Sequence, residues 1–450
     1  MSNLNLFLEK SKIDKKEYQL EGIHWCLQRE LTIPTHKLPF RGGFICDEMG
    51  LGKTIMMIAT IVSNYIPRTL VVLPNALLDQ WRQEILRTTG HRAIIFHGNT
   101  KKDVTLEILE KSTIVLTTYG TVSSTNELLQ EVTWGRIIFD EAHHLRNGSN
   151  TTRYRACFQL KANIRWMITG TPIQNKQSDL YSLCRLLRIP ETMLRNERLQ
   201  YIIQQFILKR TKKEVGLLLK DVEETDKEIQ WKHQTERQLA MELQRNFMNR
   251  ENRNILRTIL RARQMCVLPS ILETKLPEMM DTAEVKNKYP TDVPLGTSKM
   301  DAVIHTILTD RDATVGKLIF CHFRKEMDAI AERLLYHNVI NIALLDGRVK
   351  QKERDKIFSE KYEVLILQIQ TCCEGLNLQE NYSQIYFVSP NWNPSVEEQA
   401  IARCHRYGQE KTVQVFRFYM DESIDKYILS VQKNKQTVAY DTFNVTDTIA

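Results

Sequence analysis

The sequence lacks the patterns that mark secreted, membrane-spanning or zinc-binding proteins. Its nine cysteines are scattered, with one adjacent pair at Cys372 and Cys373 and no C-x-x-C spacing. This distribution argues against a zinc site and favours a reducing compartment. No apolar run approaches the roughly 20 residues that a membrane-spanning helix needs, and the first residues lack the apolar core of a signal peptide. We therefore expect a soluble, intracellular protein with no membrane contact.

The composition is that of an ordinary globular protein, with no strong bias toward one charge. Of the 450 residues, 42% are hydrophobic and 26% are charged. Lys and Arg outnumber Asp and Glu by 62 to 54, which gives a formal net charge of +8. This mild basic excess is compatible with a nucleic-acid partner without requiring one. The length predicts two or three domains, and the chain has no low-complexity tail and no solenoid repeat.

Short apolar strands alternate with helical patterns in two separate stretches, which is typical of a parallel α/β layer fold. In the first stretch the expected strands are residues 42–47, 69–74, 92–98, 112–119, 136–142 and 165–170, and in the second they are 316–323, 341–347, 364–370, 383–390 and 412–418. Residues 216 to about 290 are charged, helix-prone and poor in strand signals. We predict an α/β fold with two lobes, 1–215 and 297–450, joined by a helical insert over 216–296.

The segment DEMGLGKT (47–54) follows an expected strand and precedes the apolar helix pattern IMMIATIV. Gly50 and Gly52 allow backbone N–H groups to turn toward phosphates, and a helix N-terminus adds its dipole. Lys53 supplies a positive charge for β- and γ-phosphates, and the Thr54 hydroxyl suits Mg²⁺. The strict phosphate-loop pattern has glycine where Asp47 stands. The alternative is a glycine turn capped by Thr54 before a core helix.

The segment DEAHH (140–144) ends the expected strand RIIF. The carboxyl edge of a parallel sheet is where α/β proteins bind ligands, so two acidic residues there suggest a site. Asp140 can hold Mg²⁺ through water, and Glu141 can orient and deprotonate an attacking water. The alternative is an aspartate cap with an acidic first turn. The phosphate-loop pattern about 90 residues upstream favours the site.

The segment EEQAIARCHRYGQ (397–409) has the periodicity of a helix. In a helix Gln399, Arg403 and Arg406 would lie along one side, because residues at i, i+4 and i+7 share a face. Two arginines on one face repel each other unless an anion lies in front of them. The alternative is a solvated charged face, which is the commoner case.

These motifs, in this order, resemble those of the helicase-like ATPases of superfamily two, and specifically the Swi/Snf family of DNA translocases. DEMGLGKT, DEAHH and MITGTPIQN (167–175) carry the resemblance, together with YQLEGIHW (18–25), LPNALLDQWRQEI (73–85) and LTTYG (116–120). In the second stretch IFCHF (319–323), LLDGR (344–348), EGLNL (374–378) and NWNPSVEEQAIARCHRYGQ (391–409) follow in family order. The resemblance covers almost the whole chain and implies two RecA-like lobes, the first of which binds ATP.

The resemblance also implies a role for each group of residues. The implied ATP contacts are Gln19, Asp47, Glu48, Met49, Gly50, Leu51, Gly52, Lys53 and Thr54. Thr54 and Asp140 are implied to hold Mg²⁺. The implied catalytic residues are Lys53, Glu141, Arg403 and Arg406, the two arginines acting as arginine fingers on the γ-phosphate. The implied DNA contacts are Trp81, Thr118, Gly375, Asn377, Trp392 and Asn393.

The expected activity is that of a monomeric, ATP-driven motor that translocates on double-stranded DNA and remodels DNA or protein–DNA complexes. A strand-separating helicase and a nucleotide-gated scaffold of a transcription assembly are the alternatives. The presence of Lys53, Asp140, Glu141, Arg403 and Arg406 argues against a scaffold. No chromo-, bromo-, zinc-finger or SANT-like module is recognisable, and this compact layout resembles viral or bacterial members. We expect a nuclear location, or a viral factory or virion for a viral protein, with transcription or chromatin proteins as candidate partners.

Overall fold

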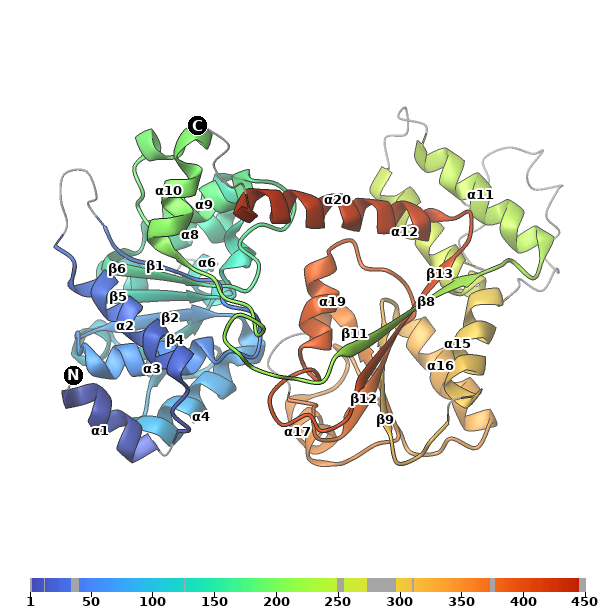
Figure 1. The fold of residues 1–450 in the computed structure, drawn as a ribbon, viewed down its shortest axis with the longest axis horizontal. Helices are drawn as coiled ribbons and strands as arrows, with labels where there is room; N and C mark the ends of the chain where they lie inside the picture. The colour runs from blue at the N-terminus through green and yellow to red at the C-terminus, as the bar shows by residue number, and fades with distance from the viewer. Residues whose placement is uncertain are drawn as a thin grey trace. The chain divides into compact units, whose positions relative to one another are not determined.

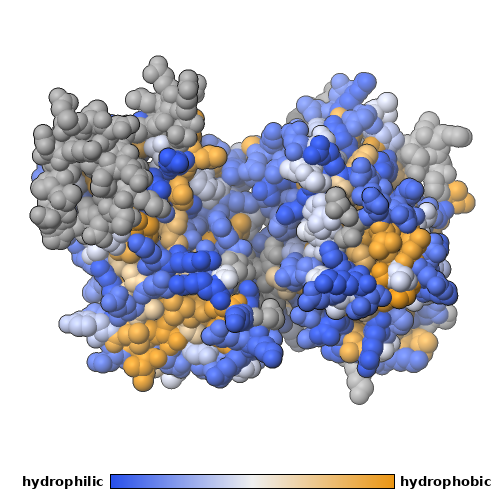
Figure 2. Space-filling model, turned by 180° about the vertical axis from the view of Figure 1, so that it is seen from behind, coloured by the Kyte–Doolittle hydropathy of each residue, from blue (hydrophilic) through white to orange (hydrophobic). Residues whose placement is uncertain are grey.

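The computed structural model describes residues 2–11, 13–33, 40–124, 127–248, 255–272, 297–309, 311–372 and 377–444 of the chain. The chain divides into two compact units, the first comprising residues 1–218 with 435–450 and the second residues 219–434. Each unit contains one sheet flanked by helices (Figure 1). The face drawn in Figure 2 is mostly hydrophilic, with an apolar patch on each unit. No helix in the described ranges has the length and apolar character needed to cross a membrane.

The first unit is built on a sheet of order β3-β4-β2-β5-β6-β1-β7, in which every described strand pair is parallel. The strands are β1 (Arg41–Ile45), β2 (Thr69–Leu73), β3 (Ile94–Phe96), β4 (Ile114–Thr118), β5 (Thr133–Asp140), β6 (Lys161–Ile168) and β7 (Ile207–Leu208). Alternate residues of β2 enter different apolar clusters, Leu70 and Val72 on one face and Val71 and Leu73 on the other. Helices therefore cover both faces of this sheet.

The covering helices of the first unit are amphipathic. They are α1 (Ser2–Ser11), α2 (Glu17–Leu31), α3 (Lys53–Ser63), α4 (Leu78–Thr89), α5 (Leu106–Lys111), α6 (Tyr119–Ser123), α7 (Glu127–Glu131), α8 (Thr152–Gln159), α9 (Ser178–Leu186) and α10 (Leu199–Phe206). In α4, for example, Leu78, Trp81 and Ile85 are buried at i, i+3 and i+7, while the charged residues between them face outward.

The second unit is built on a sheet of order β10-β11-β9-β12-β13-β8, again with every described pair parallel. The strands are β8 (Val222–Ile229), β9 (Gly316–Cys321), β10 (Ile342–Leu345), β11 (Val364–Gln368), β12 (Tyr382–Phe387) and β13 (Val413–Met420). The helices are α11 (Gln234–Met248), α12 (Ile255–Val267), α15 (Ser298–Thr309), α16 (Arg324–Tyr336), α17 (Gln351–Ser359), α18 (Ile369–Cys372), α19 (Pro394–Ile401) and α20 (Ile424–Asn444), the last of which ends in the first unit.

The structure confirms the predicted α/β fold with two parallel sheets, and each expected strand is present. Within the predicted helical insert, residues 222–229 form edge strand β8, which pairs with β13 along its whole length. The side chains of β8 are mostly exposed, so its sequence VEETDKEI shows no apolar alternation. Residues of α11 and α12 belong to the core of the second unit. The two units therefore differ from the predicted segments 1–215, 216–296 and 297–450.

The interior of the second unit contains buried charged groups. Lys299 Nζ donates to Asp425 Oδ2 at 2.6 Å, which links α15 to α20. Glu326 Oε2 accepts from the backbone N–H groups of His322 and Phe323, at 2.8 and 2.9 Å, where α16 begins. Burial raises the pKa of Glu326 to about 7, although these hydrogen bonds favour its charged form. Burying this carboxylate therefore costs folding free energy at neutral pH.

Replacing Glu326 with Gln should stabilise the second unit more as the pH rises. An acid with a raised pKa in the folded state keeps a proton that the unfolded chain has lost. The free energy of unfolding of the wild type therefore falls from about pH 4.3, the unfolded value, to about pH 7, and Gln does not titrate. We expect the melting temperature of E326Q to exceed that of the wild type by a few degrees at about pH 7.5, and by less at about pH 5. Circular dichroism would measure both.

The exposed Glu332 of the same helix provides the matched control. E332Q should shift the melting temperature by the same small amount at both pH values. A pH-independent difference between E326Q and the wild type would contradict the assignment of a buried, titrating carboxyl group.

Candidate functional site

The loop between β1 and α3 has a backbone that requires glycine at two positions. Gly50 has a φ of 91° and Gly52 a φ of 82°, both in the left-handed region that side chains disfavour. Helix α3 then begins at Lys53, with Gly52 as N-cap and no side-chain cap. The N–H groups of a first helical turn have no intrahelical acceptor, so this turn is suited to binding an anion.

The amino group of Lys53 lies inside this loop. Its Nζ donates to the backbone oxygens of Asp47 and Glu48 at 2.7 and 3.3 Å. Burial lowers the pKa of Lys53, and the carboxylates of Glu141, Asp47 and Asp140 oppose that shift. A desolvated cation at the start of a helix is suited to binding phosphate oxygens.

Asp140 and Glu141 stand where β5 ends. Trp81 Nε1 donates to Asp140 Oδ2 at 2.7 Å, and the Tyr119 hydroxyl donates to the Asp140 backbone oxygen at 2.6 Å. Burial, followed by the charge of Glu141, raises the pKa of Asp140 to about 7. Glu141 has a φ of 49°, a left-handed conformation that is strained for a residue with a side chain. Backbone strain of this kind clusters at functional sites.

Two further segments reach the same loop. Gln19 Nε2, from α2, donates to the Leu51 backbone oxygen at 3.1 Å. Gly170 follows β6, and a methyl group at this position would lie 3.2 Å from Met49 Cε and 3.8 Å from Lys53 Nζ. The segments 18–25, 47–54, 140–144 and 167–175 therefore meet at the carboxyl edge of the first sheet.

Two basic residues that the sequence patterns did not single out hold the acidic start of the loop. Arg210 Nε and Nη2 donate to the two carboxylate oxygens of Asp47 at 3.1 and 2.6 Å. Lys212 Nζ lies 3.1 Å from Glu48 Oε1. The sequence offers one sign of these two residues, the basic run KRTKK (209–213). A run of positive charges does not show which acidic residues it pairs with. Since the side chains of Asp47 and Leu51 are fully buried, only their backbone can contact a ligand.

Thr54 and Asp140 are the residues predicted to hold Mg²⁺. Thr54 lies in the first turn of α3, and Asp140 ends β5. Their hydroxyl and carboxylate oxygens are ligands of the type that Mg²⁺ prefers, and this ion usually takes its other ligands from phosphate and water. Within the described ranges, no group of three or more His, Cys, Asp or Glu side chains could hold a metal. The two oxygens fit an ion that is bound together with a phosphate.

The prediction that Gln399, Arg403 and Arg406 share a helix face was wrong. Helix α19 ends at Ile401, and the chain then continues in turns. The backbone oxygen of Arg403 accepts from the N–H of Leu378 at 3.1 Å, so it is bound outside the helix ladder. Gln399 is buried at 3% exposure, whereas both arginines are half-buried.

The guanidinium of Arg406 is held by neighbours in its own unit. Its Nε donates to the Ala402 backbone oxygen at 3.1 Å, and its Nη1 donates to the side-chain oxygen of Asn377. Burial, followed by the charge of Arg403, lowers the pKa of Arg406 to about 10. The repulsion expected between the two arginines is therefore present, and an anion would relieve it.

The predicted DNA contacts differ in their exposure. Trp81 is 1% exposed, which argues against its expected contact with DNA. Its indole N–H instead donates a hydrogen bond to the Asp140 carboxylate. Thr118 is also buried, and its hydroxyl caps α6. Trp392 is half-buried against the core of the second unit, and Asn393 caps α19. Asn377 is exposed, while Gly375 lies outside the described residues.

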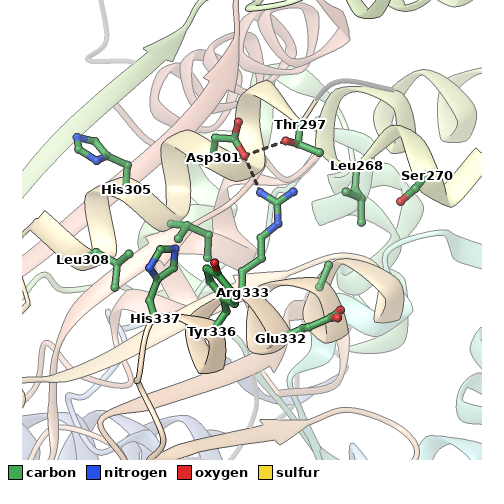
Figure 3. A pocket seen from close by; sticks show the side chains of 12 residues that line it. Leu268, Ser270, Thr297, Asp301, His305, Leu308, Glu332, Arg333, Tyr336 and His337 are labelled. Carbon is green, nitrogen blue, oxygen red and sulfur yellow. Dashed lines mark hydrogen bonds and ion pairs between the residues drawn. The ribbon is translucent and has the colours of Figure 1, made fainter. Parts of the chain in front are cut away.

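A separate pocket of about 720 Å³ lies in the second unit between α15 and α16 (Figure 3). On its wall Asp301 accepts from Thr297 at 2.8 Å and from Arg333 at 2.6 Å. Its lining includes none of the predicted site residues that the structure describes. It is therefore not part of the candidate site.

Breaking the ion pair between Arg210 and Asp47 should destabilise the first unit. Asp47 is fully buried, so R210A would leave an unpaired carboxylate and lower the free energy of unfolding by about 3 kcal/mol. Adding D47N removes the orphaned charge and should recover much of that loss. Denaturant unfolding followed by tryptophan fluorescence measures this, because Trp81, Trp134 and Trp166 are buried in the first unit. Equal destabilisation in R210A and D47N/R210A would contradict the argument.

Two protein-family models match the chain. The SNF2-related domain matches residues 18–196, and the helicase conserved C-terminal domain matches residues 298–408. The chain is 27% identical to the probable global transactivator of Orgyia pseudotsugata multicapsid polyhedrosis virus, over 96% of this chain and 91% of that protein. It is also 27% identical to the ISWI chromatin-remodeling complex ATPase ISW2 of Saccharomyces cerevisiae, over 94% of this chain and 40% of that protein.

The chain is similar to one bacterial relative and one solved structure as well. It is 28% identical to an uncharacterized ATP-dependent helicase of Mycoplasma pneumoniae, over 96% of this chain and 42% of that protein. The structure of the Sulfolobus solfataricus SWI2/SNF2 ATPase core in complex with dsDNA aligns at 26% identity and a TM-score of 0.43, over 97% of this chain and 96% of that chain. The chain thus spans most of the viral relative and less than half of the yeast and bacterial ones. The two family models and these relatives confirm the resemblance to the helicase-like, ATP-hydrolysing enzymes of the Swi/Snf family.

Proposed function

We propose that the chain is a monomeric, DNA-dependent ATPase that moves along double-stranded DNA and remodels DNA or the protein–DNA complexes on it. The observation that carries the proposal is the convergence of Lys53, Asp140 and Glu141 at the carboxyl edge of the first sheet. This arrangement combines a phosphate-binding cation, a metal-binding carboxylate and a general base. The resemblance to the Swi/Snf family supports the assignment of ATP as the substrate.

In the proposed reaction, Lys53 and the N–H groups at the start of α3 bind the β- and γ-phosphates and stabilise their charge. Glu141 accepts the proton of the attacking water. Thr54 and Asp140 hold Mg²⁺, which when bound neutralises charge on the phosphate oxygens. Because the pKa of Asp140 is raised to about 7, a proton competes for this carboxylate near neutral pH.

Arg403 and Arg406 are proposed to supply positive charge to the γ-phosphate. The charge of Arg403 and burial both disfavour the Arg406 cation, so an anion beside the pair would be bound favourably. Arginine fingers contribute on the order of 10³–10⁵ in rate. Since Lys53 belongs to the first unit and Arg406 to the second, hydrolysis in this proposal requires both units.

The proposed DNA contacts are Asn377, Trp392 and Asn393 in the second unit and the segment around Thr118 in the first. Contacts of this kind go mainly to phosphates and sugars, which suits a motor that moves along any sequence. The names of the yeast and viral relatives support nuclear chromatin or a viral transcription site as the place of action. On that basis we propose transcription or chromatin proteins as partners.

ATP hydrolysis should be slow without nucleic acid and rise at least about tenfold with duplex DNA, because the proposed reaction uses residues of both units and DNA contacts are proposed in both. A phosphate-release assay with duplex DNA, single-stranded DNA and RNA would measure this. Equal stimulation by all three nucleic acids would contradict a motor specific for double-stranded DNA. Displacement of a strand from a tailed duplex would instead favour a helicase.

The matched control for this assay is E141Q. The amide keeps the size of the side chain but cannot accept a proton from water. E141Q should therefore bind a fluorescent ATP analogue within about twofold of the wild type, while its turnover falls by about 10³ or more. K53A should instead weaken nucleotide binding, because its charge acts on the bound phosphates as well as on the transition state.

Substitution of Arg406 should separate catalysis from nucleotide binding. R406A leaves the phosphate-binding loop unchanged, so nucleotide binding should stay within about twofold, while DNA-stimulated hydrolysis falls by about 10² or more. R406K should restore little, because an ammonium lacks the planar fork of donors. Near-normal stimulated hydrolysis by a correctly folded R406A protein would rule out the proposed finger.

A further inference from the structure

A pocket lined by several cationic side chains opens in the first unit where α8 and α9 begin. Its volume is about 830 Å³, and it is lined by residues 146–151, by Lys176 and by side chains of both helices. The segment 146–151 follows DEAHH directly in the sequence, but the pocket includes none of the residues assigned to nucleotide. The proposed function does not use this feature.

The charges around this pocket are mainly positive. Four cationic side chains line it: Arg146, Arg155, Lys176 and Arg185. Arg185 Nε is paired with Glu191 Oε1 at 2.6 Å. The other three are held by no ion pair in the part of the chain that the structure describes, and Arg155 and Lys176 are exposed. The lining therefore carries more positive than negative charge.

The acidic side chain in the lining, Asp179, offsets part of the charge of Arg146. It is 3% exposed, and its Oδ2 accepts from the backbone N–H groups of Gln174, Asn175 and Lys176 at 3.3, 2.8 and 3.3 Å. It thus holds the loop before α9 in place and favours the charged form of Arg146.

Arg146 has an unused donor. Its Nη1 donates to the His143 backbone oxygen at 3.1 Å, while its buried Nε has no hydrogen-bond partner in the described structure. Burial lowers the pKa of Arg146. A partly desolvated guanidinium gains more from a charge-assisted hydrogen bond to an anion than a solvated one does. Exposed Asn147, Ser149 and Asn150 add neutral donors beside it.

The aromatic rings in the lining are already covered. Tyr154 and Phe158 stack on each other at 6.1 Å, and the Arg188 guanidinium lies 3.8 Å from the centre of the Phe158 ring. The Tyr154 hydroxyl donates to the Ser182 backbone oxygen at 3.0 Å. Stacking of a base on these rings would need a free face. The chemistry of the pocket therefore suits phosphate oxygens rather than bases.

We propose that this pocket binds the phosphodiester backbone of a nucleic acid through Arg146, Arg155 and Lys176, as a contact additional to those assigned to the motor motifs. The inference rests on the DNA-dependent function proposed above. Recognition is independent of sequence, because only backbone charge is read. Such a contact would hold the first unit on DNA without taking part in hydrolysis.

The test compares two charge reversals of equal size in the full-length chain. R155E/K176E reverses two exposed cations of the pocket, and R153E/K161E reverses two exposed cations of the same unit that do not line it. Binding to a fluorescent duplex is measured by anisotropy over a series of salt concentrations, after thermal unfolding has verified both folds. Each lost phosphate contact lowers the salt slope by about 0.9. We expect R155E/K176E to lower the slope by about 1 to 2 and the affinity at low salt at least about tenfold.

The control R153E/K161E should stay within about twofold of the wild type in affinity. If the wild type binds the duplex and the two reversals behave alike, the pocket inference is overturned while the proposed function stands. If the wild type fails to bind or respond to duplex DNA, both are overturned. Competition by poly-glutamate that is as strong as competition by unlabelled duplex, and is lost in R155E/K176E, would overturn the assignment to nucleic acid in favour of an acidic protein.

Discussion

The common direction of the strands in the first sheet is the constraint on which the candidate site depends. Because β1, β5 and β6 run parallel, the loops that follow them leave the same edge of the sheet. This brings Lys53, Asp140 and Gly170 together although they are far apart in the sequence. Without the helices that cover both faces, this edge would not be fixed, since β1, β5 and β6 contribute apolar side chains to both cores.

The two buried aspartates at this edge differ in how far neighbouring positive charges and hydrogen bonds compensate their carboxylates. Asp47 is buried and fully paired with Arg210, so it serves the loop as a fixed support. Asp140 is buried next to another carboxylate, and the hydrogen bond from Trp81 does not restore an ordinary pKa. The buried charge of Asp140 and the left-handed backbone of Glu141 both destabilise the fold. Both lie at the position where a cation and a phosphate would be bound.

The sequence patterns predicted the strands that are buried on both faces, because apolar runs bounded by turn residues are distinctive. They did not predict β8, which is an exposed edge strand, or the end of α19, after which the Arg403 backbone oxygen accepts from the N–H of Leu378. The pairing of Arg210 with Asp47 joins residues 163 positions apart, and no local pattern contains it. The role of Trp81 could not be predicted from the sequence either. A motif places this residue near the site, but only the fold shows that its indole N–H donates a hydrogen bond to Asp140.

The hydrogen bonds of Arg406 bear on ATP hydrolysis in the absence of DNA. In the proposed reaction the Arg406 guanidinium donates to a phosphate, whereas in this structure it donates to the oxygens of Asn377 and Ala402. A hydrogen bond to a charged group contributes about 1.5–3 kcal/mol, so exchanging these neutral acceptors for a phosphate is opposed by a factor of about 10 to 100 until the new bonds form. Asn377 lies within the EGLNL segment. The side chain that accepts a hydrogen bond from Arg406 is therefore in a motif for which a DNA contact is proposed. Under the proposed role of Arg406, hydrolysis would thus require the Asn377 amide and the Ala402 carbonyl to release this guanidinium.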